Sequence, residues 1–302
     1  MLKNLIKLAI TIVIFVYLFG KINFEEVHKN IEIADIPLLL MALFLAICST
    51  TLAAYRWGRV TKLLSLASGF KFYLTSYFKG SFFNQALPGS IGGDAVRMID
   101  LKEMGFSWSK SFYAVFIDRV SGLMGLLLIN ALAIIAMPSI LPSEISTSVL
   151  VVCFGGLSAL IFLSIIRKIS FLEKFKFFGR FIELSIAFRS VYHDKREILI
   201  QIGSSALVNF FSVLCVFALA RAVRLEFDVW YYCVLMPPVF LATIIPISLA
   251  GWGVREGVMV TLFAYIGADS AKILTVAMLY GIVTIISSLP GAFVWLFEKR
   301  AI

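Results

Sequence analysis

The sequence predicts an all-α polytopic membrane protein with two inverted repeats, each made of three transmembrane helices and a re-entrant hairpin of broken helices. Hydrophobic residues make up 61% of the 302 residues and charged residues only 15%, a composition far from that of soluble domains. Apolar runs long enough to cross a bilayer recur along the chain, and one helix-breaking pattern occurs twice. We therefore expect residues 1–302 to form a single transmembrane domain.

The apolar runs define the expected spans, because a transmembrane helix needs about 20 mostly apolar residues. Uncharged runs of at least this length lie at 36–55, 120–143, 145–166, 198–220, 229–254 and 273–297. A shorter apolar stretch at 5–20 predicts a further span, with the Lys3 and Lys7 side chains reaching the membrane interface. A cleavable signal peptide is the competing interpretation of that stretch, although a cleavage site is not clear.

The positions of Lys and Arg predict the topology, because these residues concentrate in the cytoplasmic loops of membrane proteins. Lysines precede the first span, and Lys299 and Arg300 follow the last one. Segment 167–197 carries eight Lys and Arg residues, whereas loop 21–35 has four acidic residues and two lysines. We expect both termini on the inner side of a prokaryotic cytoplasmic membrane. The net charge of +9 then follows from this bias and needs no nucleic-acid partner.

The duplicated pattern reads PGSIGGDAVR at 88–97 and PISLAGWGVR at 246–255. Proline and glycine interrupt helices, so each copy predicts a break inside an apolar stretch. Residues 72–96 begin and end on the cytoplasmic side and 229–266 on the outer side, which favours two re-entrant pairs of half-helices. Eight or more complete crossings are the alternative. The backbone positions of interest are Pro88, Gly89, Gly92, Gly93, Pro246, Gly251 and Gly253.

A shift of the first half by 158 residues places the span 36–55 on 194–213 and the span 111–137 on 269–295, and both positions coincide with apolar runs. Three complete spans per half is an odd number, so the two halves are inverted relative to each other, as in many carriers. The two repeats extend over about 1–138 and about 145–298.

Residues 171–190 have a different pattern, with apolar residues from Phe171 to Ile186 at spacings of three and four and charged residues between them. This pattern predicts an amphipathic helix. Such a helix lies either on the cytoplasmic membrane surface or against the protein's own flank, and the sequence favours neither.

Arg97 and Arg255 end the two copies of the pattern, and each has an acidic residue nearby. An internal ion pair that closes each hairpin is one interpretation. A contact with phosphate is the other, because a guanidinium matches phosphate geometry and a helix N-terminus favours an anion. Ser90 and Ser248 either donate to a phosphate oxygen or cap the following half-helix.

Asp118 and Arg119 lie together inside an apolar span, where an unpaired charge is costly. One of the two is expected to meet a charge on another segment, and the natural contacts are Asp118 with Arg97 or Arg119 with Asp94. Asn209 is expected to join two helices by a hydrogen bond. The predicted substrate-binding residues are Asp94, Arg97, Asp118, Arg119, Arg255, Glu256, Ser90, Ser248 and Asn84.

Composition and spacing argue against catalysis, cofactors and metals. The four cysteines lie inside apolar runs, where they act as small buried hydrophobes. His28 and His193 are far apart in expected loops, so no zinc site is predicted. No nucleotide-binding motif is found, and no histidine accompanies a candidate nucleophile. We expect no catalytic residues, no metal and no cofactor.

The motifs are NQALPGSIGGDAVR at 84–97, Asp118-Arg119, PIS at 246–248 and GWGVRE at 251–256. Together they resemble the lysylphosphatidylglycerol synthase transmembrane region, also called the flippase-like family, over about residues 5–297. The best-known members carry a cytoplasmic aminoacyl-transferase domain, and their membrane part is held to move lysyl-phosphatidylglycerol between leaflets. This sequence lacks that domain, so the resemblance implies the membrane fold and lipid translocation, and not aminoacylation.

The expected function is that of a lipid flippase or scramblase that moves an anionic phospholipid or a lipid-linked glycan precursor across the cytoplasmic membrane. Arg97 and Arg255 would face one cavity between the hairpins, near the membrane midplane, and contact the headgroup phosphate. The alternative is a membrane-embedded transferase, or an essential partner of one, acting on polyprenyl-phosphate lipids. A scaffold of an envelope-synthesis complex is the third alternative. The expected partners are a membrane lipid and an envelope-synthesis enzyme.

Overall fold

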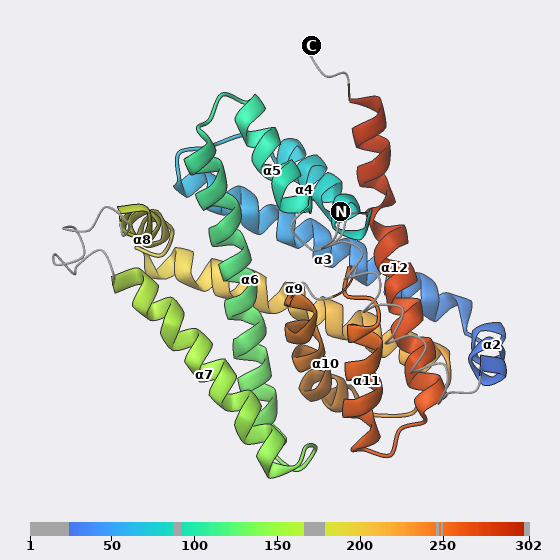
Figure 1. Ribbon diagram of the computed structural model, residues 1–302. Helices are drawn as coiled ribbons and strands as arrows, with labels where there is room; N and C mark the ends of the chain where they lie inside the picture. Colours follow the sequence, from blue (N-terminus) through green and yellow to red (C-terminus); the bar gives the residue numbers. More distant parts are fainter. Residues whose placement is uncertain (1–23, 87–91, 166–178, 246–247, 249, 299–302) are drawn as a thin grey trace.

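The computed structural model describes residues 24–86, 92–165, 179–245, 248 and 250–298, and these residues form helices joined by short loops (Figure 1). The described helices are α2 (Phe24–Glu32), α3 (Ile36–Leu63), α4 (Phe70–Ala86), α5 (Gly92–Glu103), α6 (Trp108–Ala136), α7 (Ser143–Ile165), α8 (Gly179–Val191), α9 (Lys195–Ala222), α10 (Val229–Ile244), α11 (Val254–Ala264) and α12 (Ser270–Phe297). No strand occurs among these residues, so the all-α prediction is confirmed. The expected span 5–20 lies outside the described residues.

Five of the described helices, α3, α6, α7, α9 and α12, are long and apolar enough to cross a membrane. They coincide with five of the predicted spans, and the polytopic class is confirmed. The predicted run 229–254 is the exception, because it divides at a break and leaves α10 with only 16 residues. Helix α3 continues beyond the predicted end at residue 55 to Leu63, because its last two turns bury Arg56, Trp57 and Val60.

Helix α7 shows why this fold requires an apolar surrounding. It packs against α6 along one side. Its other side carries Val151, Val152, Phe154, Ile161 and Phe162, each more than half exposed. Apolar side chains spread along a whole helix face are unfavourable in water and favourable in a hydrocarbon layer. The outward face of α7 therefore fits an integral membrane protein.

Both predicted helix breaks are present. Helix α4 ends at Ala86 and α5 begins at Gly92, and α10 ends at Ile244 and α11 begins at Val254. The helices on either side of each break pack against each other. In the first hairpin a Cβ atom on Gly93 would lie 2.0 Å from the carbonyl oxygen of Gly80, so this close approach requires glycine. Figure 1 shows the two hairpins on opposite sides of the central helices α3 and α9.

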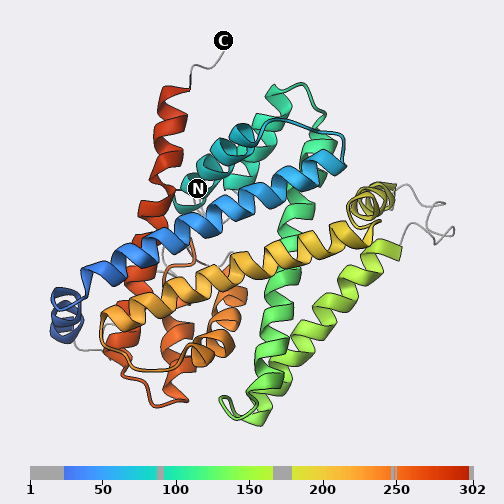
Figure 2. The same ribbon diagram turned by 180° about the vertical axis from the view of Figure 1, so that it is seen from behind.

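Helices α3 and α9 lie side by side and run antiparallel through the centre of the molecule (Figure 2). At one end the Asp35 N–H donates to the Ala222 carbonyl at 3.1 Å, and at the other end Arg59 pairs with Glu197. The elements after them repeat in order and length, with α4 matching α10, α5 matching α11 and α6 matching α12. The contacts between halves are reciprocal too, because α4 packs on α12 and α10 packs on α6. Two inverted halves would make these contacts, while their orientation in a membrane stays a prediction.

The described part of the predicted amphipathic helix is α8, and residues 171–178 lie outside the described residues. Leu184 and Phe188 of α8 are buried in a cluster with Val60 of α3 and Ile117 of α6. The Ile186 side chain faces outward and is 53% exposed. This helix thus packs on the protein's own flank with one face and leaves an apolar residue on the other.

Candidate functional site

The centre of the candidate site is Asp118, which is 1% exposed and lies in α6. Its Oδ2 accepts a hydrogen bond from Arg97 Nη2 at 2.7 Å, and its Oδ1 accepts one from Arg56 Nε at 2.9 Å. The predicted contact between Asp118 and Arg97 is confirmed. Arg56 further donates to the Asp118 carbonyl at 3.2 Å and to the Ser205 hydroxyl of α9 at 3.1 Å. One carboxylate thus holds α3, α5 and α6 together.

A second carboxylate, Asp94, completes the cluster. It pairs with Arg119, as the sequence predicts, and lies 3.7 Å from Arg97 Nη1. The five side chains of this charged cluster are Arg56, Asp94, Arg97, Asp118 and Arg119. Three guanidinium groups face two carboxylates, so the cluster has a net charge of +1. A buried charge is costly unless it is paired or hydrated. Arg56, Arg97 and Asp118 are buried and paired, whereas the Arg119 side chain is 39% exposed, so solvent reaches the cluster on that side.

Aromatic rings hold the Arg97 guanidinium in place. Its Cζ lies 4.2 Å from the centroid of the Trp57 ring and 4.4 Å from that of the Tyr77 ring. Both distances suit cation–π attraction, which is stronger away from water. The Arg97 Nε is buried and has no hydrogen-bond partner among the described residues. Arg97 is therefore fixed in position with one donor still available.

A cavity of about 340 Å³ opens beside the charged cluster. Its lining residues are Arg56, Tyr77, Gly80, Ser81, Asn84, Gln85, Asp94, Arg97, Asp118, Arg119 and Ala250. Most of them come from the α4–α5 hairpin and from α3 and α6. Ala250 comes from the second break, which therefore reaches the site formed by the first half. We call this space the charged cavity.

The start of α5 lies beside the charged cavity, because Asp94 in its first turn lines this space. The Asn84 Oδ1 of α4 accepts the Gly93 N–H at 2.9 Å and so ties the two half-helices together. A helix N-terminus carries a positive partial charge, which adds to the positive balance of the cluster. Gly92 is the first residue of α5. Pro88, Gly89 and Ser90 lie outside the described residues.

The second break is arranged differently. Arg255 Nη2 lies 2.5 Å from Glu256 Oε1, and the Gly253 N–H donates to Glu256 Oε2 at 2.5 Å. Gly251 and Gly253 have φ angles of 81° and 84°, in the left-handed region that glycine favours. Arg255 and Glu256 are both buried. The ion pair is internal, as one of the two interpretations expects, but it joins adjacent residues of α11 and does not link this helix to α10.

The sequence-based expectation placed Arg97 and Arg255 at one cavity. Arg97 lines the charged cavity, whereas Arg255 is not among its lining residues and lies 4.8 Å from the Trp252 ring centroid. The Ser248 Oγ is buried and has no hydrogen-bond partner among the described residues, so it caps no helix there. Pro246 lies outside the described residues. Asn209 donates to the Gly122 carbonyl of α6 at 3.3 Å, as expected for a contact between helices.

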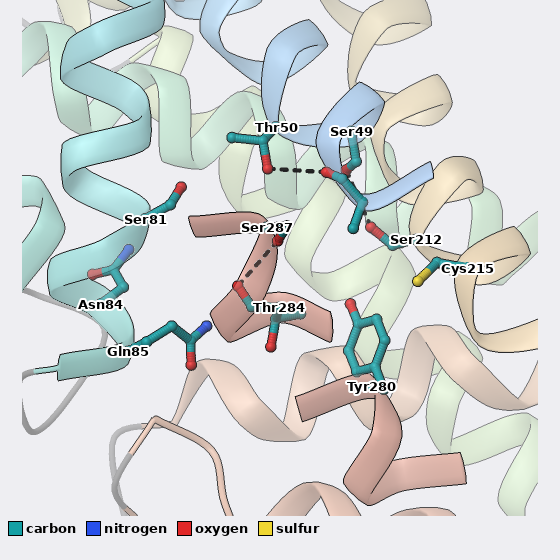
Figure 3. Close-up of a pocket in the computed structure, with 11 residues that line it drawn as sticks. Ser49, Thr50, Ser81, Asn84, Gln85, Ser212, Cys215, Tyr280, Thr284 and Ser287 are labelled. Atoms are coloured by element: carbon teal, nitrogen blue, oxygen red, sulfur yellow. Dashed lines mark hydrogen bonds between the residues drawn. The ribbon is translucent and has the colours of Figure 1, made fainter. Parts of the chain in front are cut away.

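A second cavity of about 180 Å³ lies between α3, α4, α9 and α12 (Figure 3). Its lining residues are Ala46, Ser49, Thr50, Ser81, Asn84, Gln85, Ser212, Cys215, Tyr280, Thr284 and Ser287. None of them carries a formal charge. Ser81, Asn84 and Gln85 line both cavities, so the two spaces meet at α4. We call this second space the hydroxyl cavity.

Sequence reasoning missed two parts of this site. Arg56 follows an apolar run, where a basic residue usually marks the cytoplasmic end of a span. Its distance from Asp118 in the sequence gave no sign of their contact. The hydroxyl residues are scattered over four helices, and serine or threonine within a helix normally bonds to its own backbone. In the described part of the chain no three His, Cys, Asp or Glu residues are grouped to hold a metal ion.

Comparison with known proteins agrees with the motifs. The family model of the lysylphosphatidylglycerol synthase TM region matches residues 4–291. A UPF0104 membrane protein of Pyrococcus horikoshii is 27% identical, over 99% of this chain and 98% of its own length. Another of Methanothermobacter thermautotrophicus is 26% identical, over 87% of this chain and 84% of its own length. The chain therefore belongs to the family of the lysylphosphatidylglycerol synthase transmembrane region.

Proposed function

We propose that the protein is a lipid flippase or scramblase that moves an anionic lipid between the leaflets of the cytoplasmic membrane. The headgroup phosphate binds in the charged cavity, while the hydrocarbon chains remain in the bilayer. The protein performs no chemical reaction on the lipid and needs no cofactor. Any net flux follows a gradient, the membrane potential or consumption of the lipid on one side.

The net charge of the charged cluster is the observation that carries this proposal. Each of the three guanidinium groups contacts a carboxylate, but they share only two carboxylates, so the cluster keeps a charge of +1. A phosphodiester headgroup carries one negative charge and would bring the cluster to neutrality. The Arg97 Nε, which has no hydrogen-bond partner among the described residues, would supply a further donor for its oxygens, and the N-terminus of α5 would add a positive partial charge.

The broken hairpin gives this site a way to open and close. Asn84, Asp94 and Arg97 all belong to the α4–α5 hairpin, whereas their partners Asp118 and Arg119 belong to α6. Discontinuous helices in carriers place substrate sites at such breaks, and one element moves against another during transport. Binding of a phosphate by Arg97 would compete with Asp118 and loosen the hairpin from α6.

Reconstitution in liposomes tests the proposal. Phospholipids labelled on an acyl chain are bleached by dithionite only in the outer leaflet, so added bleaching reports translocation. We expect wild-type protein to translocate an anionic lipid and Arg97→Gln to do so at least tenfold more slowly, about the effect of losing one or two charged hydrogen bonds. Arg59→Gln is the matched control, because Arg59 pairs with Glu197 outside both cavities. Its rate should remain within twofold of wild type.

Bleaching equal to that of protein-free liposomes, for several anionic headgroups, would overturn the proposal. Product formation from a polyprenyl-phosphate lipid in detergent, where no leaflets exist, would favour a membrane-embedded transferase instead.

A further inference from the structure

We propose that the hydroxyl cavity binds the uncharged, hydroxyl-bearing part of a phospholipid headgroup while the phosphate lies in the charged cavity. This inference rests on the proposed function and names the class of lipid that the site selects. A phosphatidylglycerol-like headgroup has the required parts, namely one phosphodiester and a short polyol.

Most of the residues that line the hydroxyl cavity are polar, and none of them is charged. Seven hydroxyl groups and two carboxamides surround it, from helices α3, α4, α9 and α12. Without a carboxylate or a cation, it offers no counter-charge to an ammonium group or to a second phosphate. Transfer of either from water into this space would be costly, whereas a neutral polyol could exchange its water contacts for hydroxyl contacts.

Several hydroxyl groups of the cavity already donate hydrogen bonds to backbone carbonyls of their own helices. Thr50 donates to the Ala46 carbonyl at 3.0 Å, Thr284 to the Gly281 carbonyl at 2.8 Å, and Ser287 to the Thr284 carbonyl at 3.0 Å. The hydrogens of these hydroxyls are therefore used within the protein, and their oxygens still offer lone pairs. A ligand that fits them must donate, as an alcohol does and a phosphodiester oxygen does not.

Two side chains that point into the same space have no hydrogen-bond partner in the part of the chain that the structure describes. Figure 3 shows Ser81 and Gln85 of α4 directed toward Thr284 and Ser287 of α12 across the cavity. Neither the Ser81 hydroxyl nor the Gln85 carboxamide has a hydrogen-bond partner among the described residues. Together they can both donate to and accept from a ligand hydroxyl.

The two cavities are arranged for one molecule. Ser81, Asn84 and Gln85 line both of them, so a ligand held at Arg97 by its phosphate can extend along α4 into the hydroxyl cavity. At roughly 15 Å³ for each water, the space of about 180 Å³ holds a group of about ten non-hydrogen atoms. A glycerol or a single sugar ring falls within this size, and a long glycan does not.

The test compares two lipids that differ only in hydroxyl groups. Acyl-labelled phosphatidylglycerol and phosphatidylpropanol have the same charge and the same headgroup skeleton, but phosphatidylpropanol lacks both hydroxyls. We expect wild-type protein in liposomes to translocate phosphatidylglycerol at least fivefold faster. Gln85→Leu and the smaller change Ser81→Ala should each bring the ratio of the two rates to within twofold of one. Thr261→Val is the matched control, because Thr261 bonds to its own helix in α11, outside both cavities, and should leave the ratio unchanged.

The failures of the two proposals differ in this assay. Equal wild-type rates for both lipids, still lowered by Arg97→Gln, would overturn the hydroxyl selection and leave the lipid translocation intact. A preference that persists in both Gln85→Leu and Ser81→Ala would also overturn it. Faster movement of acyl-labelled phosphatidylethanolamine than of phosphatidylglycerol would assign the cavity to an amine. No translocation of any lipid would overturn both proposals.

Discussion

Asp118 supports the candidate site because its two carboxylate oxygens bind two different arginines. Arg56 approaches from α3 and Arg97 from α5, and all three side chains are nearly inaccessible to solvent. An isolated guanidinium would not remain in such a place, because the cost of removing it from water exceeds what packing returns. The pairing of Asp118 with both arginines thus allows a cluster with a net positive charge to remain inside the protein.

Replacement Asp118→Asn keeps the shape of the side chain and removes its charge. Arg56 and Arg97 would stay buried without a full counter-charge, which typically costs about 3–5 kcal/mol. We expect a clear fall in the midpoint of thermal unfolding in detergent. Asp269→Asn is the control, since Asp269 is an exposed N-cap and asparagine caps a helix equally well. Equal midpoints for the two variants would contradict the central role of Asp118.

Gly93→Ala tests the close contact inside the first hairpin. The added methyl group would lie 2.0 Å from the Gly80 carbonyl oxygen, so α4 and α5 would have to separate. We expect destabilisation of about 3 kcal/mol or more and a loss of lipid translocation. Gly69→Ala is the matched change, because nothing lies within 4 Å of its added methyl group. The comparison uses thermal unfolding and the liposome assay, and normal behaviour of Gly93→Ala would show that the hairpin contact is looser.

At the scale of elements, the first hairpin is tied to the last span as well as to α6. The Lys79 Nζ of α4 lies 2.8 Å from Asp100 Oδ1 of α5 and 2.7 Å from Glu298 Oε2, directly after α12. Gly291 of α12 lies against the backbone of Phe78, so the two helices approach very closely. The hairpin is thus held at its sides, while Asn84, Asp94 and Arg97 on it line the charged cavity.

The two partners of Lys79 should differ in their importance. Asp100 is buried, whereas the Glu298 side chain is 45% exposed and largely screened by solvent. Asp100→Asn should lower the free energy of unfolding by about 2 kcal/mol or more, because a buried cation loses its inner partner. Glu298→Gln should lower it by less than about 1 kcal/mol, as for a surface ion pair. Chemical unfolding in detergent measures both, and the reverse order would show that α12 holds the hairpin more strongly than α5 does.

The sequence predicted the helix breaks and the spans well, because the residue types within each segment determine both. The Pro and Gly residues at 88–93 and 246–253 located both breaks, and apolar length located the spans. The site was only partly predictable, because a sequence shows which charges are buried but not which helix faces bring them together. Asp118 pointed to Arg97 by its costly position, whereas Arg56 resembled an ordinary interfacial charge. The hydroxyl cavity depends on which faces four helices turn toward one another, and no motif in the sequence marks it.

At the scale of the whole molecule, the two halves repeat in element order while their chemistry differs. All five residues of the charged cluster belong to helices of the first half. At the corresponding break of the second half, Arg255 is neutralised by the adjacent Glu256. The second half contributes Ala250 to the charged cavity and hydroxyl groups of α9 and α12 to the hydroxyl cavity. One asymmetric pair of cavities thus arises from two halves that share the same order of elements.

The predicted membrane orientation can be checked on intact cells. In a cysteine-free variant, Ser139→Cys places a thiol in the exposed loop between α6 and α7, and Ser109→Cys places one near the start of α6. A membrane-impermeant maleimide should label the first from outside, and the second only after the membrane is permeabilised. The opposite pattern would reverse the topology. Labelling of both from outside would contradict α6 as a span.

If the protein translocates lipid as proposed, the origin of the charged cluster in one half of the chain has a kinetic consequence. A passive protein cannot change the final ratio of a lipid in the two leaflets, because that ratio is fixed by the free energy of the lipid on each side. A binding region whose charges come from one half only would instead let entry from the two leaflets saturate at different lipid concentrations. When the lipid is supplied steadily to one leaflet, such a protein would carry it faster in one direction than in the other. At equilibrium the forward and reverse fluxes of lipid are still equal.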